Sequence, residues 1–567
     1  MTLDPIDDPV NDPDARLQRS RWIDWRFMLA DPSPGRAGHL GPAEGEMLQA
    51  LRDAGWQLTE IQTARGSAIP RLDLDLVIVI RPRGRDLAEA GRHVRRGGTL
   101  YVACDGPFGG AWRRPRPLDP QAVVRRLAGL GFVDARVHVD VPRHDRRSAI
   151  LPLEDPAALR LLLRRRGGFA DRRPVRVAAE VLRRTGWLAR IAPAAGVVAR
   201  RGPAIVGDRD AVSTFVRAPI PAGSEGFGGS DERPAPLLLT PTFRASRHVV
   251  ALVPTPDGTR ADLVAKISRQ ADSGEVTRRE AAILAEVGSG PAAVSASAPT
   301  LVKVGTPWGL PTLLETGLVG EPLDPAAVRR DREAAIARVV PWLAAMVRPA
   351  APDSWPAADR RLDDLLGSPM AAFASALPPD AAERLLASRT LAIVNPLRAT
   401  QLPDLIEHGD VSHPNLLVTP QGTLAAVDWE LGELHGLPGH DLFGFLAYVA
   451  VAGARATDAR SQASAITSAM AEPDGWMDRA AGDYARRIGL DAALLPALAA
   501  ASWARRVVGL VERLHDGRPR AISPDTLAWL RDHRYVAAWT AAVERADHAR
   551  AGSSVPVRAA APMDDTP

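Results

Sequence analysis

The first half of the chain alternates between short apolar runs and amphipathic stretches of about ten residues. The clearest apolar run is Leu74–Ile80 (LDLVIVI), whose β-branched residues are typical of a strand buried on both faces of a parallel sheet. Further strands are predicted at Arg36–Leu40, Trp56–Gln62, Thr99–Ala103 and Ala135–Val141, and helices at Glu44–Ala54, Leu87–Arg96 and Pro120–Leu130, with a turn at Gly97-Gly98. Alternating strands and helices predict an α/β domain with a Rossmann-like, mostly parallel sheet.

The stretch from Asp155 to Arg201 is rich in arginine and helical in pattern. Its run of leucines around Leu161 is too apolar for a basic arm, so we interpret it as packing helices with a solvated basic face. Residues 218–236 (APIPAGSEGFGGSDERPAP) contain the Pro, Gly and Ser of a linker. We therefore predict a disordered tail over residues 1–20, an N-terminal domain over 21–215 and a linker over 216–236.

The second half begins with strand patterns and continues with helical ones. An antiparallel hairpin is predicted at Arg247–Pro254 and Ala261–Ser268, a helix at Glu275–Val287, and strands at Thr300–Val304 and Leu310–Leu314. Helical patterns follow at Pro325–Val347, Leu362–Ala376, Ala381–Ala387, Leu391–Leu397, Leu442–Ala452, Arg460–Ala471, Trp476–Ile488, Asp491–Leu514 and Pro524–Ala546. This order predicts a small α+β lobe over residues 237–318, a helical lobe over 319–548 and a disordered tail over 549–567.

Composition narrows the class of protein. The chain has 567 residues, too many for one core, and its 46% hydrophobic and 24% charged residues are those of a globular protein. The net charge of +4, with 67 acidic residues, argues against a nucleic-acid partner. Cys104 is the only cysteine, which excludes intrachain disulfides and fits a reducing cytoplasm. No signal-peptide order and no apolar run of about 18 residues is present, so we expect a soluble cytoplasmic protein without a membrane partner.

Lysine and asparagine are rare in this chain. Lys266 and Lys303 are the only lysines among 71 basic residues, and Asn11, Asn395 and Asn415 are the only asparagines. A lysine that persists against such a bias suggests a site where arginine's broad fork cannot replace an ammonium group. We expect this of Lys266, whereas Lys303 is expected to face solvent.

The densest group of polar residues lies between Leu405 and Ala447. His408-Gly409-Asp410 is followed by Asn415, by two short apolar strands around the turn at residues 420–423, and by Asp428. Phosphoryl transfer needs a carboxylate near the attacking hydroxyl, with an amide oxygen and a second carboxylate on Mg²⁺. This stretch supplies that set in order.

The same stretch resembles the catalytic segment of the aminoglycoside phosphotransferase and choline kinase family, relatives of protein kinases. The resemblance implies a bilobal, protein-kinase-like α+β domain in the second half. It implies that Asp410 is the catalytic base, that Asn415 and Asp428 hold metal, and that Asp441, together with His408, braces the catalytic loop.

The small lobe extends this resemblance. Lys266 in Val-Ala-Lys-Ile-Ser looks like the lysine that grips the α- and β-phosphates of ATP, with Glu280 as its orienting partner and Glu286 as the alternative. Thr316 and Leu318 match the hinge whose backbone binds adenine.

The phosphate loop departs from the glycine-rich pattern of protein kinases. Its place is taken by residues 242–247 (TFRASR), which contain no glycine. We expect Ser246 and the neighbouring arginines to take over the contacts to phosphate.

Residues 33–200 resemble a class I S-adenosylmethionine-dependent methyltransferase, on the order DLDLVIVI, helix, RRGGTLYVA, helix and strand. Family members bind the cofactor on a Gly-x-Gly-x-Gly turn. Here Gly38, Gly41 and Gly45 are more widely spaced, and Glu60 is the only candidate for the acidic ribose ligand. We therefore expect a degenerate domain with a docking or scaffolding role that does not bind S-adenosylmethionine.

The sequence thus predicts an ATP- and Mg²⁺-dependent phosphotransferase that acts on a hydroxyl group of a small molecule. Two alternatives stay open: a non-catalytic nucleotide-binding or regulatory protein built from two degenerate enzyme folds, and a bifunctional methyltransferase-kinase. The acceptor is left open among sugars, aminoglycosides, choline-like alcohols and polysaccharide precursors, because the helical lobe lacks a dense acidic patch for a polycation.

Overall fold

The computed structural model divides the chain into two compact units. Unit 1 contains residues 1–285 and 299–319, and unit 2 contains residues 286–298 and 320–567. The residues that the structure describes are 13–41, 45–61, 70–83, 85–105, 119–142, 144, 147–166, 172–203, 210–218, 234–241, 246–290, 292–348, 358–514 and 521–553.

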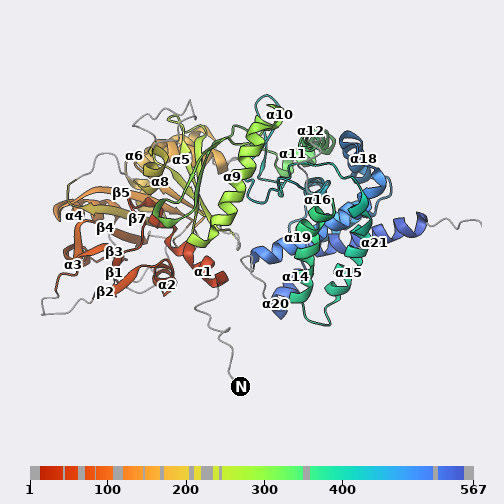
Figure 1. Cartoon of the computed structure of the whole chain (residues 1–567). Coiled ribbons are helices and arrows are strands. Elements are labelled where there is room, and N and C mark those ends of the chain that lie inside the picture. The colour runs from red at the N-terminus through yellow and green to blue at the C-terminus, as the bar shows by residue number, and fades with distance from the viewer. Residues whose placement is uncertain are drawn as a thin grey trace, which may run out of the picture. The chain divides into compact units, whose positions relative to one another are not determined.

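Unit 1 is built on one twelve-stranded sheet within the described residues (Figure 1). Its strands are β1 (Arg36–Leu40), β2 (Gln57–Glu60), β3 (Leu74–Ile80), β4 (Val94–Asp105), β5 (Phe132–Val141), β6 (Ala149–Pro152), β7 (Ala194–Arg201), β8 (Leu237–Leu239), β9 (His248–Pro254), β10 (Ala261–Ser268), β11 (Leu301–Gly305) and β12 (Thr312–Thr316). Their order across the sheet is β11-β12-β10-β9-β8-β6-β5-β7-β4-β3-β1-β2.

The sheet is mixed, so the prediction of a mostly parallel sheet is confirmed only for part of it. Strands β2, β1, β3 and β4 run parallel, as the LDLVIVI pattern of β3 predicted. Strand β7 lies between β4 and β5 and runs antiparallel to both. The helical prediction for residues 155–201 is therefore wrong at Ala194–Arg201. The short β5–β6 connection also imposes an antiparallel pair, because a parallel pair needs a long crossover.

The sheet does not stop where the sequence placed the domain boundary. Strand β8 pairs with β6 on one side and with β9 on the other, so the strands of the expected small lobe continue the sheet of the N-terminal half. Most of the predicted linker, residues 219–233, lies outside the described residues.

Alternation along the strands buries apolar side chains on both faces of the unit 1 sheet. In β3, Leu76 and Ile78 belong to a core that also contains side chains of β9, β10 and β12, whereas Val77 and Val79 face a second core. The helices of the first 220 residues are α1 (Pro13–Ser20), the 3-10 helix η2 (Arg21–Met28), α2 (Gly45–Asp53), α3 (Asp86–His93), α4 (Pro120–Gly129), α5 (Pro156–Arg166), α6 (Arg173–Arg184), α7 (Trp187–Ile191) and α8 (Ala211–Arg217). Both α2 and α8 cover the first face, and α3 and α4 the second.

Two local predictions in unit 1 need correction. The expected tail is helical from Pro13: Leu17 of α1 is buried and Arg19 forms a 2.8 Å ion pair with Asp53. Residues 1–12 lie outside the described residues. The expected turn at Gly97-Gly98 lies inside β4, where Gly97 has φ of 80° and the pairing jumps from Leu74–Val94 to Leu76–Thr99. The extra residues form a bulge, so the strand continues past them.

The short elements of the expected small lobe are η4 (Ala271–Ser273), α9 (Gly274–Ser289), α10 (Ala292–Ser295) and η5 (Pro307–Gly309). The boundary between the two units falls within α9, after Ala285. Figure 1 shows the first part of α9, in light green, beside the strands of unit 1.

Unit 2 consists of helices and one three-stranded sheet in the order β13-β14-β15, as far as the structure describes it. Its strands are β13 (Glu321–Pro322), β14 (Leu416–Val418) and β15 (Leu424–Ala426). Its helices are α11 (Pro325–Arg330), α12 (Arg332–Ala344), α13 (Ala358–Leu362), η6 (Asp363–Gly367), α14 (Ser368–Ala376), α15 (Ala382–Val394), η7 (Asn395–Ala399), α16 (His440–Ala454), α17 (Ala459–Ala471), α18 (Trp476–Ile488), η8 (Ala492–Leu494), α19 (Leu495–Leu514), α20 (Pro524–Arg531) and α21 (Arg534–Ser553).

Several helix boundaries in unit 2 differ from the prediction. The expected helix Pro325–Val347 is two helices, because Asp331 has non-helical backbone angles and caps α12 through the N–H of Ala334. The expected break after Ala387 is absent, and α21 continues into the predicted C-terminal tail as far as Ser553. The stretch Ala492–Leu514 is long and apolar enough to cross a membrane, yet 61% of it is buried, as in the central helix of a helical core.

Candidate active site

Asp410, the expected catalytic carboxylate, is held by hydrogen-bond donors from its own loop. The hydroxyl of Ser412 donates to Asp410 Oδ1 at 2.9 Å, and the amide nitrogen of Asn415 donates to Asp410 Oδ2 at 3.0 Å and to the Asp410 carbonyl at 3.2 Å. The Asp410 side chain is half-buried. Its carboxylate is therefore oriented and still accessible, as a group that must meet a substrate hydroxyl has to be.

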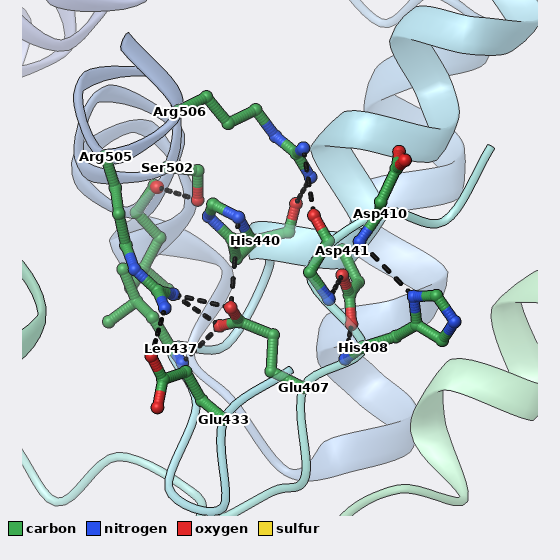
Figure 2. A network of polar contacts seen from close by, with 12 residues as sticks. Glu407, His408, Asp410, Glu433, Leu437, His440, Asp441, Ser502, Arg505 and Arg506 are labelled. Atoms are coloured by element: carbon green, nitrogen blue, oxygen red, sulfur yellow. Dashed lines mark hydrogen bonds and ion pairs between the residues drawn. The ribbon is translucent and has the colours of Figure 1, made fainter. Parts of the chain in front are cut away.

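Asp441, the second residue of α16, fixes the start of this loop. Its Oδ2 accepts the backbone N–H of His408 at 2.7 Å, and its Oδ1 accepts that of Gly409 at 2.9 Å. Figure 2 shows the Asp441 carboxylate pointing at the loop, with the Asp410 side chain directed away from it. Asp441 thus makes the contacts expected of a loop brace, and Gly439 rather than Asp441 is the helix N-cap.

Arg506 on α19 holds the same loop from the other side. Its guanidinium donates to the Gly409 carbonyl at 3.3 Å and to the His440 carbonyl at 2.9 Å (Figure 2). Two glycines make room for this arrangement: a Cβ on Gly444 would lie 2.1 Å from Arg506 NH2, and Gly409 has φ of 87°. Asp410 is therefore placed by contacts to the two residues that precede it, from Asp441 to His408 and Gly409 and from Arg506 to Gly409.

A buried ion network lies directly behind the loop. Arg505 donates to both oxygens of Glu407 at 2.6 Å and to Glu433 at 3.3 Å, and the N–H of Leu437 donates to Glu407 at 3.0 Å (Figure 2). Burial, and secondarily the negative charge of Glu407, raise the pKa of Asp441 to about 7, against the opposing effect of its two N–H donors and Arg506. The Asp441 carboxyl group therefore titrates near neutral pH.

The β14–β15 hairpin brings the two expected metal ligands together. Leu416 pairs with Ala426, and the N–H of Val427 donates to the Asn415 carbonyl at 2.9 Å, so Asp428 follows the residue opposite Asn415. Asp428 has φ of 71°, a left-handed conformation that costs a non-glycine residue free energy and that clusters at functional sites.

His408 supports this conformation. Its Nε2 lies 3.0 Å from the Val427 carbonyl, and its ring lies 4.6 Å from that of Trp429, so it contacts both neighbours of Asp428. The His408 of the motif therefore links the catalytic loop to the strand end that carries Asp428.

The oxygen atoms of the Asn415 and Asp428 side chains are suitable ligands for Mg²⁺. The Asn415 amide nitrogen is bonded to Asp410, which leaves its oxygen as the atom for a metal, and Asp428 adds a carboxylate. No cluster of three or more His, Cys, Asp or Glu side chains in the described part of the chain could hold a metal by itself. Mg²⁺ does not need one, because it usually takes one or two protein oxygens together with water and substrate phosphates.

Lys266 is buried in unit 1 and is ion-paired with Glu280. Its neighbours Ala265 and Ile267 point into the core shared with the N-terminal half, so the alternation of β10 directs Lys266 to the opposite face. Glu280 shares a buried stripe of α9 with Ile283 and Val287, which brings its carboxylate to the ammonium group. Glu315 Oε1 lies 3.9 Å from the same ammonium nitrogen.

The remaining small-lobe residues have mixed outcomes. Glu286, the alternative partner for Lys266, instead pairs with Arg348 at 2.9 Å within unit 2. The N–H of Thr316 donates to Thr300 at 3.0 Å, so it closes the end of the β11–β12 pair. Contacts of Thr316 or Leu318 to adenine stay a prediction.

The phosphate loop is described only at its end. Thr242–Ala245 lie outside the described residues, and the Ser246 carbonyl accepts a 2.7 Å hydrogen bond from Arg269. A role of the Ser246 hydroxyl at phosphate is untested and stays a prediction.

The solvent-facing prediction for Lys303 is wrong. Its side chain is buried, and its ammonium group donates to the carbonyls of Phe215 and Ala218 at the end of α8 and lies 4.5 Å from the Phe215 ring centroid. Burial lowers its pKa. Lys303 thus caps a helix of the N-terminal half from a strand of the small lobe, a site where a compact charge fits.

Strand packing explains two of the three glycines considered for the cofactor turn, whereas a Cβ on the third, Gly45, would meet nothing within 4 Å. A Cβ on Gly38 would lie 2.5 Å from Leu74 Cδ1, and one on Gly41, which has φ of 112°, would lie 2.5 Å from the Ile80 carbonyl. Both glycines let β1 approach β3 closely. Glu60 is exposed at the end of the edge strand β2.

The sequence was compared with models of known protein families. Residues 245–476 match the family model described as Phosphotransferase enzyme family (APH). The C-terminal half carries a phosphotransferase-family domain. The phosphotransferase domain includes all ten residues predicted for the site, from Ser246 to Asp441. No curated protein matches the chain.

Solved structures show only distant likenesses to the phosphotransferase domain. An apo thermostable mutant of aminoglycoside phosphotransferase APH(4)-Ia is 15% identical, with 55% of this chain and 92% of that chain covered and a TM-score of 0.34. Choline kinase LicA from Streptococcus pneumoniae is 10% identical over 54% and 91% of the two chains, with a TM-score of 0.33. Aminoglycoside phosphotransferase APH(3'')-Id from Streptomyces rimosus is 17% identical over 47% and 89%, with a TM-score of 0.31. These scores are low, so the assignment rests on the family model.

Sequence reasoning missed several residues that shape the site. Ser412 was not singled out, although a serine two residues after a loop aspartate is a common local hydrogen-bonding pattern. Glu315 and Arg506 had no such signal, because their distance from Lys266 and from the catalytic loop is set by tertiary packing.

Proposed function

We propose that this protein is an ATP- and Mg²⁺-dependent phosphotransferase that transfers the γ-phosphate to a hydroxyl group of a small molecule. The observation that carries the proposal is the loop and hairpin at residues 408–428, where Asp410, Asn415 and Asp428 are joined by direct hydrogen bonds and strand pairing. The family domain over residues 245–476 supports the same reaction class.

Asp410 has the chemistry of a group that orients the acceptor. Ser412 and Asn415 each donate to one of its oxygens, so the carboxylate cannot rotate freely, and the remaining lone pairs accept the proton of the attacking hydroxyl. Because phosphoryl transfer depends mainly on positioning, this fixed orientation is the main contribution of Asp410.

Lys266 has the chemistry of a phosphate ligand. Its ammonium group is held between Glu280 and Glu315 on a buried strand, and these two carboxylates offset the cost of burying a cation. In this proposal it contacts the α- and β-phosphates, while Asn415 and Asp428 would hold Mg²⁺. The metal, when bound, neutralises charge on the transferred group.

A thermal-shift titration of the full chain tests nucleotide binding. ATP with Mg²⁺ is expected to raise the melting temperature, because a ligand at one hundred times its Kd stabilises the folded state by about 2.7 kcal/mol. ATP with EDTA and Mg²⁺ alone are the controls, and Asp428→Asn is the matched variant expected to respond less to the metal. An unchanged melting temperature with ATP and Mg²⁺ contradicts the proposal.

Turnover is tested by a screen for ATP consumption with hydroxylated metabolites. The panel contains sugars, aminoglycosides and choline-like alcohols, and each positive acceptor is repeated with Asp410→Ala. Consumption that depends on the acceptor and on Asp410 supports phosphoryl transfer. Acceptor-dependent consumption that survives in Asp410→Ala removes Asp410 from the mechanism.

A further inference from the structure

One segment of the N-terminal half is buried against strands from both parts of the unit 1 sheet. We call residues Arg21–Met28, which form η2, the bridging segment. Its Trp25 ring stacks on Tyr101 of β4 with centroids 3.7 Å apart, and the Trp22 carbonyl accepts a 3.0 Å hydrogen bond from Arg147. Trp25 and Phe27 belong to the core that also contains residues of β9, β10 and β12.

The bridging segment reaches the phosphotransferase domain through an ion pair. Arg269 NH2 donates to Asp24 Oδ2 at 2.8 Å, and Arg269 Nε donates to Asp24 Oδ1 at 3.0 Å. Both side chains are completely buried. Arg269 directly follows β10, three residues after Lys266, and its carbonyl accepts a 2.6 Å hydrogen bond from Arg26. A bidentate pair of this kind fixes the position of the guanidinium group.

A different nitrogen of the Arg269 guanidinium group contacts the end of the expected phosphate loop. Arg269 NH1 donates to the Ser246 carbonyl at 2.7 Å, and the Arg269 backbone N–H donates to the Arg247 carbonyl at 2.8 Å. One guanidinium group therefore joins Asp24, in the N-terminal half, to the backbone that leads into β9.

The balance of charge makes this arrangement depend on Asp24. Burial, and secondarily the positive charge of Arg269, lower the pKa of Arg21 and of Arg26 to about 10, so both stay charged at neutral pH. The Asp24 carboxylate offsets this repulsion. Without it, Arg269 is a buried cation that has lost its carboxylate among other cations, and the Ser246 contact loses its support.

We propose that Asp24 is a positioning residue for the nucleotide phosphates, acting through Arg269 on the backbone at Ser246 and Arg247. By this route the N-terminal half sets the nucleotide affinity of the phosphotransferase domain, whose expected phosphate loop contains no glycine. The inference rests on the proposed function, because it assumes that the backbone at Ser246 and Arg247 lies beside the phosphates of ATP.

The first test compares the steady-state kinetics of Asp24→Asn with the unmodified chain. Asparagine keeps the shape of the side chain and removes its charge. The KM for ATP is expected to rise about tenfold with kcat changed less than about twofold, because the loop is loosened while Asp410 is untouched. Asp24→Glu, which restores the carboxylate, is expected to recover part of the affinity.

Asp140→Asn is the matched control. Asp140 is likewise completely buried and paired with an arginine, Arg147, at 2.6 Å. Arg147 also donates to the Trp22 carbonyl of the bridging segment, so Asp140→Asn disturbs that segment while the contacts of Arg269 with Asp24 and Ser246 stay in place. It is expected to lower the melting temperature while leaving the KM for ATP unchanged. If Asp24→Asn does not fold, Arg269→Lys replaces it, since a lysine keeps the charge beside Asp24 but cannot also reach the Ser246 carbonyl.

Hydrogen exchange separates failure of this inference from failure of the proposed function. Faster amide exchange in the peptide containing Ser246 and Arg247 is expected in Asp24→Asn and not in Asp140→Asn, whether or not ATP binds. A chain that does not bind ATP refutes the proposed function alone. Unchanged exchange at this peptide, or a KM for ATP that rises equally in Asp140→Asn, shows that Asp24 is merely structural and overturns the inference.

Discussion

The Oδ2 atom of Asp441 accepts a 2.7 Å hydrogen bond from the backbone N–H of His408, which precedes it by 33 residues. This contact joins the start of helix α16 to the start of the catalytic loop. Because a second N–H, that of Gly409, binds the other oxygen, the position of Asp410 depends on a carboxylate that never needs to touch substrate.

Replacing Asp410 by asparagine is expected to lower kcat by about 10²- to 10⁴-fold, the usual contribution of a positioned acid or base. The fold should be unaffected, since Asp410 is half-buried and its carboxylate accepts hydrogen bonds from Ser412 and Asn415 of its own loop. The measurement is acceptor-dependent ATP consumption alongside a thermal melt. Ser412→Ala, which removes one hydrogen-bond donor to Asp410, is the control, and its kcat should fall much less. A variant with full turnover contradicts the role of Asp410.

Phosphoryl transfer is expected to lose activity as the pH falls through about 7. Asp441 serves two N–H donors only while both of its oxygens are acceptors, and its pKa is about 7. Glu407→Gln removes a neighbouring negative charge and should move the acid limb to lower pH. Glu433→Gln, which also loses a contact to Arg505, is the control that should leave the limb in place. Rate profiles between pH 5 and pH 9, run in equal ionic strength, decide the matter.

The same shift predicts a trend in stability. The folded-state pKa of Asp441 lies above the unfolded value of 3.8, so the unfolded chain releases this proton first as the pH rises. The contribution of Asp441 to the free energy of unfolding therefore falls between about pH 4 and pH 7 and is constant above that window. Urea titrations of the unmodified chain and of Glu407→Gln at these two pH values measure it. A contribution that rises over this window would have the wrong sign.

Glu280→Gln is expected to weaken nucleotide use without abolishing it. It removes one of two carboxylates near Lys266 and leaves Glu315, 3.9 Å from the ammonium nitrogen. A hydrogen bond to a charged group contributes about 1.5–3 kcal/mol, so kcat/KM for ATP should fall by about 10- to 100-fold. Lys266→Met should lower kcat/KM for ATP more than Glu280→Gln does. Glu286→Gln, on the same helix but paired with Arg348, is the matched control with unchanged kinetics. Equal effects at Glu280 and Glu286 contradict the assignment.

A truncated chain that starts at Leu237 is expected not to fold. It would remove β6, the partner of β8, and would uncover the face formed by side chains such as Ala251 and Ile267, which pack in the core shared with Trp25. Size-exclusion chromatography and a thermal melt are the measurements. In the full chain, Trp25→Ala should cost about 3–5 kcal/mol, as large-to-small core substitutions do. A soluble truncated chain with a cooperative melt would show that the small lobe folds without the N-terminal half.

The relative positions of three expected site residues could be predicted from local sequence. Asp410, Asn415 and Asp428 lie within one loop and hairpin, so their spacing in sequence fixes their spacing in space. Lys266 stood out because the chain otherwise avoids lysine. Lys303 stood out for the same reason, yet its role was missed, because its partners at the end of α8 are 85 or more residues away.

The division of the chain into two units was harder to predict from the sequence. The Pro-, Gly- and Ser-rich stretch before Leu237 indicated a boundary, but a linker in sequence does not prevent the strands on either side of it from pairing. Arg269 and Asp24 gave no pattern at all, since neither residue is unusual in its local sequence and their pairing spans 245 residues.

The sequence by itself indicated a phosphotransferase-family domain and many of the strands and helices, because turn chemistry, side-chain periodicity and a short sequence motif act over tens of residues. Only the tertiary structure decided that one sheet runs through both halves, that Lys303 is buried, that Asp24 pairs with Arg269, and that Arg506 contacts the backbone of Gly409. The reason is physical: strand pairing and buried ion pairs depend on which distant groups are desolvated together, and no local pattern records that.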